Sequence, residues 1–189
     1  MVEIYKEQIA NSEDLVEIAQ ILASDPDFKK RVVGQKSSPY DSATFLKGLE
    51  TPPISFNRKG DTLYLAGYTK NGNIGEDTKA AIAKTIEKGL ITGIHFISSD
   101  GLFLTLLESA IAGGLGFDIT TDSEVEEKEF LFAKSRYVAV VSVDEDHENA
   151  LADLFFNKGV KLILLGHVTK GELRIDDISY GFCKDYLPE

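Results

Sequence analysis

One stretch of the chain, residues 91–119, constrains the fold more than any other, because it predicts a strand, a polar turn and a helix in direct succession. Ile91 to Ile97 is an apolar run with one polar interruption, His95, and its length suits a central strand rather than a helix. From Leu102 to Ala112 apolar side chains go nearly all round the predicted helix. Such a helix must be buried. The stretch therefore predicts a sheet covered by helices.

The turn between this strand and this helix, here called the elbow, consists of Ser98, Ser99, Asp100 and Gly101. Its first three residues are good N-caps, and its glycine lets a neighbouring backbone approach closely. Free N–H groups at the head of a helix, beside hydroxyls and a glycine, form a candidate site for a phosphate or carboxylate. The alternative is that Asp100 simply caps the helix. Gly113 and Gly114, followed by Gly116, predict the end of the helix.

His95 has two interpretations. A lone histidine on a buried strand is more often a satisfied core residue than a functional one, but near neutral pH it could also donate to a substrate phosphate or amide. The three histidines, His95, His147 and His167, lack metal-ligand spacing, and Cys183 has no cysteine–histidine pattern around it. No catalytic residue and no metal site is predicted.

Several separated motifs resemble the C-terminal-type domain of the ATP-dependent purine-biosynthesis superfamily, whose members are similar to aminoimidazole ribonucleotide synthase. The resemblance is greatest to phosphoribosylformylglycinamidine synthase, which has a His-Asp-x-Ser-Asp-Gly-Gly-Leu turn, an apolar helix ending in Ala-Glu, and then Ala-Gly-Gly-x-Gly. It extends from about Phe56 to Arg174. The matching residues are His95, Ser98, Gly101, Leu102, Glu108, Ile111-Ala-Gly-Gly-Leu-Gly116, Asp118, Leu131-Phe132, Arg136-Tyr137-Val138 and Gly166-His-Val-Thr169.

The chain departs from the family pattern at four polar positions nearest the family's ligand. The first aspartate of the turn is replaced by Phe96, the second by Ser99, and the first glycine of the pair by Asp100. The glutamate that follows Leu-Phe in the family is replaced by Lys134 or lost in a shortened loop.

The resemblance implies a ligase that forms a C–N bond in purine biosynthesis, using ATP with magnesium and ammonia or glutamine to convert formylglycinamide ribonucleotide into its amidine. ATP and magnesium would be held mainly by an ATP-binding partner domain or subunit, so we expect this chain alone to bind neither and to be inactive. Its expected contribution is the substrate-phosphate side of a composite site. The residues expected there are His95, Ser98, Ser99, Asp100, Gly101, Gly113 and Gly114. The alternative is a non-catalytic binding or assembly module that keeps the fold with a degenerate site.

Composition narrows the class of partner. A formal net charge of −11 argues against nucleic acid or an anionic membrane as the main partner. No apolar run reaches the roughly 18 to 20 residues of a membrane span, and the first ten residues hold no signal-peptide core. A single cysteine excludes an internal disulfide, so a cytoplasmic location is expected. Assembly into a homo-oligomer is left open.

Strand and helix patterns alternate along the rest of the chain, which predicts an α/β (α+β) fold: a single domain with a mixed central β-sheet and helices packed against it. Residues 1–54 form a helical lead-in that does not match the family, and residues 55–189 form the synthase-like α/β domain. Predicted helices cover 13–23 (capped by Asn11 or Ser12), 41–49, 77–88 and 145–157, with a short amphipathic turn at 28–33. Predicted strands cover 62–66, 137–143 and 160–169, with 172–175 returning as a hairpin and 2–9 as an edge strand or lead-in. Residues 72–75 are expected to be a flexible loop rather than a phosphate cradle. Residues 122–129 are expected to form a solvated acidic helix face. In the C-terminal tail, Tyr180, Phe182 and Tyr186 are expected to pack on the body of the domain.

Overall fold

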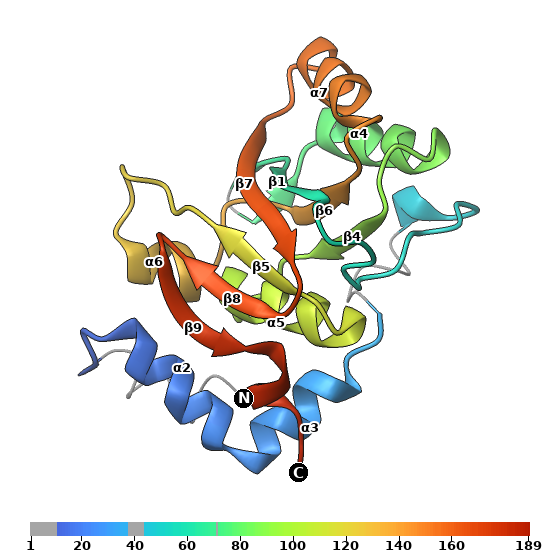
Figure 1. Cartoon of the computed structure of the whole chain (residues 1–189). Coiled ribbons are helices and arrows are strands. Elements are labelled where there is room, and N and C mark those ends of the chain that lie inside the picture. The colour runs from blue at the N-terminus through green and yellow to red at the C-terminus, as the bar shows by residue number, and fades with distance from the viewer. Residues whose placement is uncertain (1–10, 38–43, 71) are drawn as a thin grey trace.

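The computed structural model describes residues 11–37, 44–70 and 72–189 and has an α/β fold built on a mixed sheet (Figure 1). Seven strands lie in the order β4-β6-β1-β7-β5-β8-β9, and every neighbouring pair is antiparallel except β5 and β8. These strands are β1 (Thr62–Ala66), β4 (Gly93–Phe96), β5 (Gly116–Ile119), β6 (Ala139–Val143), β7 (Leu162–Thr169), β8 (Glu172–Ile175) and β9 (Ile178–Phe182). The mixed sheet and the single domain confirm the predicted fold class.

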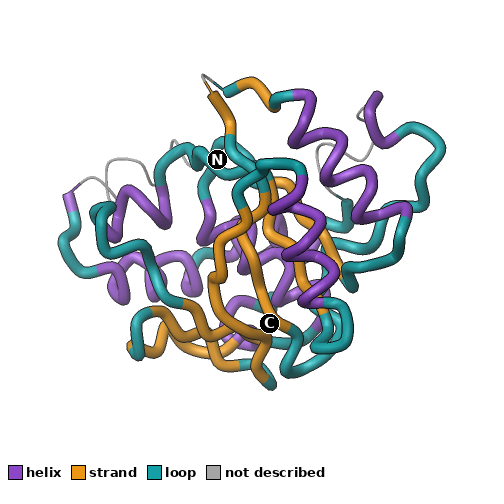
Figure 2. Tube along the Cα trace, turned by 90° about the horizontal axis from the view of Figure 1, so that it is seen from above, coloured by secondary structure: helices purple, strands orange, loops and turns teal. Residues whose placement is uncertain are grey.

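Helices cover both faces of the sheet in two separate apolar cores. One core joins the sheet to α5, α2 and α3, and the other joins it to α4 and α7 (Figure 1). Seen from above, helices lie along part of the sheet, while some strands reach the lower edge of the view with no helix beyond them (Figure 2). The helices are α2 (Leu15–Ser24), α3 (Pro26–Gly34), α4 (Glu76–Glu87), α5 (Leu102–Gly113), α6 (Glu127–Phe132) and α7 (Glu148–Asn157), with 3-10 turns η1 (Thr44–Leu46) and η2 (Cys183–Tyr186). None of the helices in these described ranges has the length and apolar composition needed to cross a lipid bilayer.

The predicted central strand lies at one edge of the sheet, as β4. All four of its residues are buried, and its other side is covered because the Ile94 N–H donates to the Pro53 carbonyl at 3.0 Å. A covered edge hides its backbone from solvent as well as a neighbouring strand would. The expectation of a central position was therefore wrong, because burial alone does not distinguish the two cases.

The predicted hairpin between the strand ending at Thr169 and the strand 172–175 was also wrong. β5 lies between β7 and β8, pairing with β7 in antiparallel and with β8 in parallel fashion. The hairpin is instead formed by β8 and β9, and its turn contains Asp176 and Asp177, both with positive φ. β5 itself has only four residues, the first of them Gly116, which is too few to produce a clear alternating pattern.

The N-terminal helices belong to the same core as α5. α2 is capped by the side chain of Asp14 rather than by Asn11 or Ser12, and its predicted apolar face is buried. The expected short turn at 28–33 is the full helix α3, because Asp25 caps it and Pro26 occupies its first position. The predicted division at residues 54 and 55 stays a prediction, although α2 and α3 share a core with α5 and with Tyr186.

The remaining elements differ from expectation in detail. Where a flexible loop was expected at 72–75, Asn73–Ile74 form the strand β3, which pairs in antiparallel fashion with β2 (Thr69–Lys70). Within 44–49 the expected helix is only the turn η1, while residues 2–9 and 41–43 lie outside the described ranges. The acidic run is mostly a loop, because α6 begins at Glu127. Tyr180 and Tyr186 are buried as expected, but Phe182 is 46% exposed.

Candidate functional site

The elbow follows the edge strand β4 and leads directly into α5. Its N-cap is Gly101, with φ of 97° and no side-chain capping bond, so the expected cap by Asp100 was wrong. A side chain at this position would lie 2.8 Å from the carbonyl oxygen of Leu131, which means that only glycine fits between the elbow and the end of α6. The Asp100 carboxylate instead accepts from Arg31 of α3 at 2.5 Å. Its negative charge is thereby neutralised.

Two elbow residues, Ser98 and Ser99, open onto a cavity of about 380 Å³, here called the elbow cavity. Its other walls come from the β2–β3 hairpin and from the segment between α6 and β6, including Lys134 and Ser135. Among the described residues, none that lines it is an aspartate or glutamate. The lining residues are Thr69, Gly72, Ile74, Ile97, Ser98, Ser99, Lys134, Ser135, Tyr137 and Val138.

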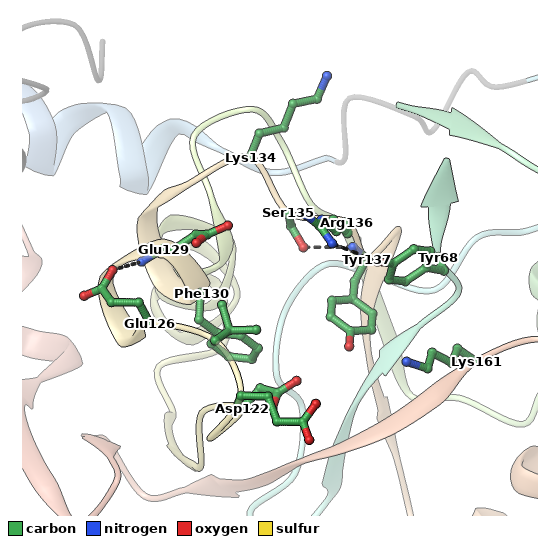
Figure 3. A pocket seen from close by; sticks show the side chains of 12 residues that line it. Tyr68, Asp122, Glu126, Glu129, Phe130, Lys134, Ser135, Arg136, Tyr137 and Lys161 are labelled. Carbon is green, nitrogen blue, oxygen red and sulfur yellow. Dashed lines mark hydrogen bonds between the residues drawn. The ribbon is translucent and has the colours of Figure 1, made fainter. Parts of the chain in front are cut away.

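The electrostatics of this cavity favour an anion. In the part of the chain that is described, Lys134 has no ion pair, and its tip points away from the acidic residues nearby (Figure 3). The Ser98 hydroxyl oxygen accepts from the Asp100 N–H at 3.2 Å, and that of Ser135 accepts from the Tyr137 N–H at 3.0 Å. Both hydroxyls keep their own hydrogens for donation. A lysine and several hydroxyls without a carboxylate match the needs of a phosphate.

His95 does not line the elbow cavity. Its side chain is 2% exposed, and its Nε2 atom lies 2.7 Å from a carboxylate oxygen of Glu108 on α5. The Nδ1 atom is buried and has no hydrogen-bond partner among the described residues. The pair ties β4 to α5 beneath the elbow, which corresponds to the core interpretation of this histidine.

Gly113 and Gly114 lie at the far end of α5 from the elbow. The helix has 12 residues, which places the two ends about 18 Å apart. A side chain at Gly113 would come within 1.9 Å of the Phe56 carbonyl oxygen, and Gly114 closes the helix with φ of 67°. The structure therefore brings Ser98 and Ser99 together at one cavity, and it places the glycine pair elsewhere.

The sequence pattern of the family described as "AIR synthase related protein, C-terminal domain" matches residues 70–177. The chain belongs to this family. The match spans β2 to the β8–β9 turn and so includes the whole elbow cavity except Thr69.

Individual members of the AIR synthase related family are similar to this chain over part of their length. It is 31% identical over 146 residues to the phosphoribosylformylglycinamidine synthase subunit PurL of Thermobifida fusca, covering 75% of this chain and 19% of that protein. It is 33% identical over 138 residues to the same subunit of Leuconostoc mesenteroides, covering 61% of this chain and 18% of that one. The chain thus spans about a fifth of the length of these relatives.

Solved structures of the family share the fold. The T. maritima PurL complexed with ATP aligns with a TM-score of 0.60 at 13% identity, covering 76% of this chain and 28% of that one. The T. maritima PurL complexed with FGAR aligns with a TM-score of 0.57 at 12% identity, covering 89% and 37%. Together with the family match, these findings confirm the resemblance read from the motifs.

Two residues of the site were missed as contributors. Lys134 was seen only as a departure from the family pattern, yet it lines the same cavity as Ser99 and contributes a cation there. Arg31 is 69 positions before Asp100 and outside the family match, so no local signal connects the two. Magnesium does not fit the elbow cavity as the described residues form it, because none of them contributes a carboxylate there and they contain no group of three or more metal-ligating side chains.

Proposed function

We propose that this chain is part of a phosphoribosylformylglycinamidine synthase, as a fragment or a reduced subunit, and that its elbow cavity forms the substrate-phosphate side of a composite site. The observation that carries the proposal is the cavity itself, which Ser98, Ser99 and Lys134 line and to which the described residues contribute no carboxylate. The relatives with 31% and 33% identity are subunits of that enzyme. The fold of T. maritima PurL complexed with FGAR further supports it.

The division of labour follows from what the chain offers. Lys134 would act as a point charge on a phosphate oxygen, and the two serine hydroxyls would donate to the remaining oxygens. ATP, magnesium and the source of ammonia would be supplied on the partner domain or subunit, because the elbow cavity lacks carboxylates for a metal. We expect the purified chain alone to show no magnesium-dependent ATP turnover, which a phosphate-release assay measures.

The test is calorimetric titration with formylglycinamide ribonucleotide. We expect Lys134→Gln to weaken binding by about tenfold to a hundredfold, the usual effect of losing a hydrogen bond to a charged group. Lys88→Gln is the matched control, because Lys88 is exposed and precedes β4 whereas the elbow follows it. The Lys88→Gln variant should bind formylglycinamide ribonucleotide with the affinity of the unmodified chain.

Two results would contradict the proposal. Equal affinity of Lys134→Gln and Lys88→Gln would remove the elbow cavity from the binding site. No binding by the unmodified chain, with or without a PurL partner domain, would favour the alternative of an assembly module that keeps the fold with a degenerate site.

A further inference from the structure

A second cavity, of about 440 Å³, lies beside the elbow cavity and shares Lys134, Ser135 and Tyr137 with it. It is enclosed on one side by α6 and the loop that precedes it, and on the other by Tyr68, after β1, and Lys161, before β7 (Figure 3). This space is here called the dipolar cavity. Its volume is within the range of small-molecule sites, about 300 to 1,000 Å³.

Charges of opposite sign line the two sides of the dipolar cavity without pairing. Asp122, Glu124, Glu126 and Glu129 belong to the side formed by α6 and its leading loop, while Arg136 and Lys161 belong to the other. In the described ranges, none of these six side chains forms an ion pair within 4.0 Å. Opposite charges held apart across a cavity leave both sets available to a ligand.

The two cations are held in place by an aromatic ring. Arg136 donates to the Tyr68 hydroxyl oxygen at 3.4 Å, and Lys161 Nζ lies 5.6 Å from the centre of the Tyr68 ring. Tyr68 in turn meets Tyr137 edge to face, with ring centres 5.7 Å apart. The contacts with Tyr68 therefore position both cations without an ion pair to a carboxylate in the described ranges.

Tyr137 adds a neutral donor between the two charged sides. Its hydroxyl points toward the space between Asp122 and Lys161 (Figure 3). Burial raises the pKa of Tyr137 above its usual value, and Asp122 and Tyr68 raise it further. At neutral pH the phenol therefore keeps its proton.

We propose that the dipolar cavity binds a small zwitterion of the α-amino-acid class, with its ammonium group against Asp122 and Glu124 and its carboxylate against Arg136 and Lys161. A phosphate or a plain anion fits poorly, because four acidic residues line the cavity: Asp122, Glu124, Glu126 and Glu129. A plain cation would leave Arg136 and Lys161 without an opposite charge. The inference does not depend on the proposed synthase role, since it uses none of the elbow serines.

The experiment is a ligand-observed NMR screen of the full chain against the twenty α-amino acids, each at about 10 mM, which detects the weak binding expected of small ligands. At least one amino acid is expected to bind. Each one that binds is then compared with its N-acetyl derivative and with the amine that lacks the carboxylate, and both should bind at least about tenfold more weakly, since each loses one charged contact. No binding by any amino acid, or equal binding by either derivative, would overturn the inference.

Paired variants test the position of the ligand. Lys161→Gln and Glu124→Gln should each weaken amino-acid binding by at least about fivefold, because a charged hydrogen bond is lost. Lys88→Gln and Glu145→Gln are the charge-matched controls, since both residues are exposed and neither lines the cavity. If Lys161→Gln and Glu124→Gln weaken binding no more than the two control variants do, the ligand binds elsewhere and the assignment is refuted.

Discussion

Replacement of Gly113 by alanine tests whether the glycine pair of the family motif acts in packing. A Cβ atom at Gly113 would lie 1.9 Å from the Phe56 carbonyl oxygen, whereas ordinary contact begins at 3.4 Å. The Phe56 backbone is not free to retreat, because its N–H donates to the Ser109 carbonyl of α5 at 3.1 Å and its side chain is 2% exposed. The alanine must therefore displace a segment that is fixed to the same helix.

The cost can be worked from this geometry. Overpacking that forces a backbone shift costs roughly 1 to 3 kcal/mol. Alanine gains at most about 1 kcal/mol over glycine in a helix, and less at its last residue. We therefore expect Gly113→Ala to lower the free energy of unfolding by about 2 kcal/mol.

Two other glycines at helix ends provide matched controls. Gly114→Ala meets open space but needs φ of 67°, so it should cost about 1 kcal/mol. Gly34→Ala, at the end of α3, has open space and no positive φ, so it should be neutral or stabilising by up to about 1 kcal/mol. Urea unfolding followed by far-ultraviolet circular dichroism suits a chain without tryptophan. A Gly113→Ala variant as stable as the unmodified chain would refute the packing argument and return Gly113 to the list of ligand-contacting candidates.

Three further predictions concern buried groups and the metal. Glu108→Ala leaves the buried His95 without its partner and should lower the free energy of unfolding in urea by about 3 kcal/mol. The control Glu87→Ala, on the surface, should lower it by less than about 0.5 kcal/mol. Equal effects of the two variants would contradict the pairing of His95 with Glu108. Tyr186→Phe removes the 3.0 Å bond from its hydroxyl to the Tyr180 carbonyl and should cost about 1 kcal/mol. Burial raises the pKa of Tyr186 above 10.0, so the stabilisation by its neutral phenol is complete below about pH 10 and is lost as the pH rises further. Between about pH 9 and 11 the free energy of unfolding should therefore fall less steeply with pH in Tyr186→Phe than in the unmodified chain. An unchanged slope would contradict this. The affinity for formylglycinamide ribonucleotide, measured by calorimetry, should be the same in EDTA as in magnesium, because the described residues contribute no carboxylate to the elbow cavity. A requirement for magnesium would argue against direct contact between the substrate phosphate and Lys134.

The elements that the sequence predicts well are those with a long or regular local pattern. Helix α5 and strand β1 were predicted to within a residue of their observed bounds, because apolar periodicity and flanking glycines mark them. What the local pattern does not contain is the order of strands. The position of β5 between β7 and β8 depends on pairings with residues about 50 positions away, such as Asp118 with His167.

The elbow shows the same limit at the level of single side chains. Its residues were predicted as an N-cap, since serine and aspartate favour that position. The backbone at Gly101 takes φ of 97° because the end of α6 lies against it, and this moves the cap one residue further. Arg31 then takes Asp100 as its partner. Both contacts arise from segments that come together only in the folded chain.

The departures from the family motif form a consistent set once their places are known. Phe96 is completely buried and packs edge to face with Phe45, so the first aspartate position has become part of the core beside α4 and α7. Ser99 and Lys134 line the elbow cavity, where the family pattern has two acids. Across the four departures three acids of the family pattern are lost, while one lysine and one aspartate, Asp100, are gained. A site lined by carboxylates holds phosphate only through a bridging cation, whereas hydroxyls and a lysine hold it directly. The substitutions therefore change how an anion would be held, and they do so without disturbing the strand, the elbow or the helix that present it.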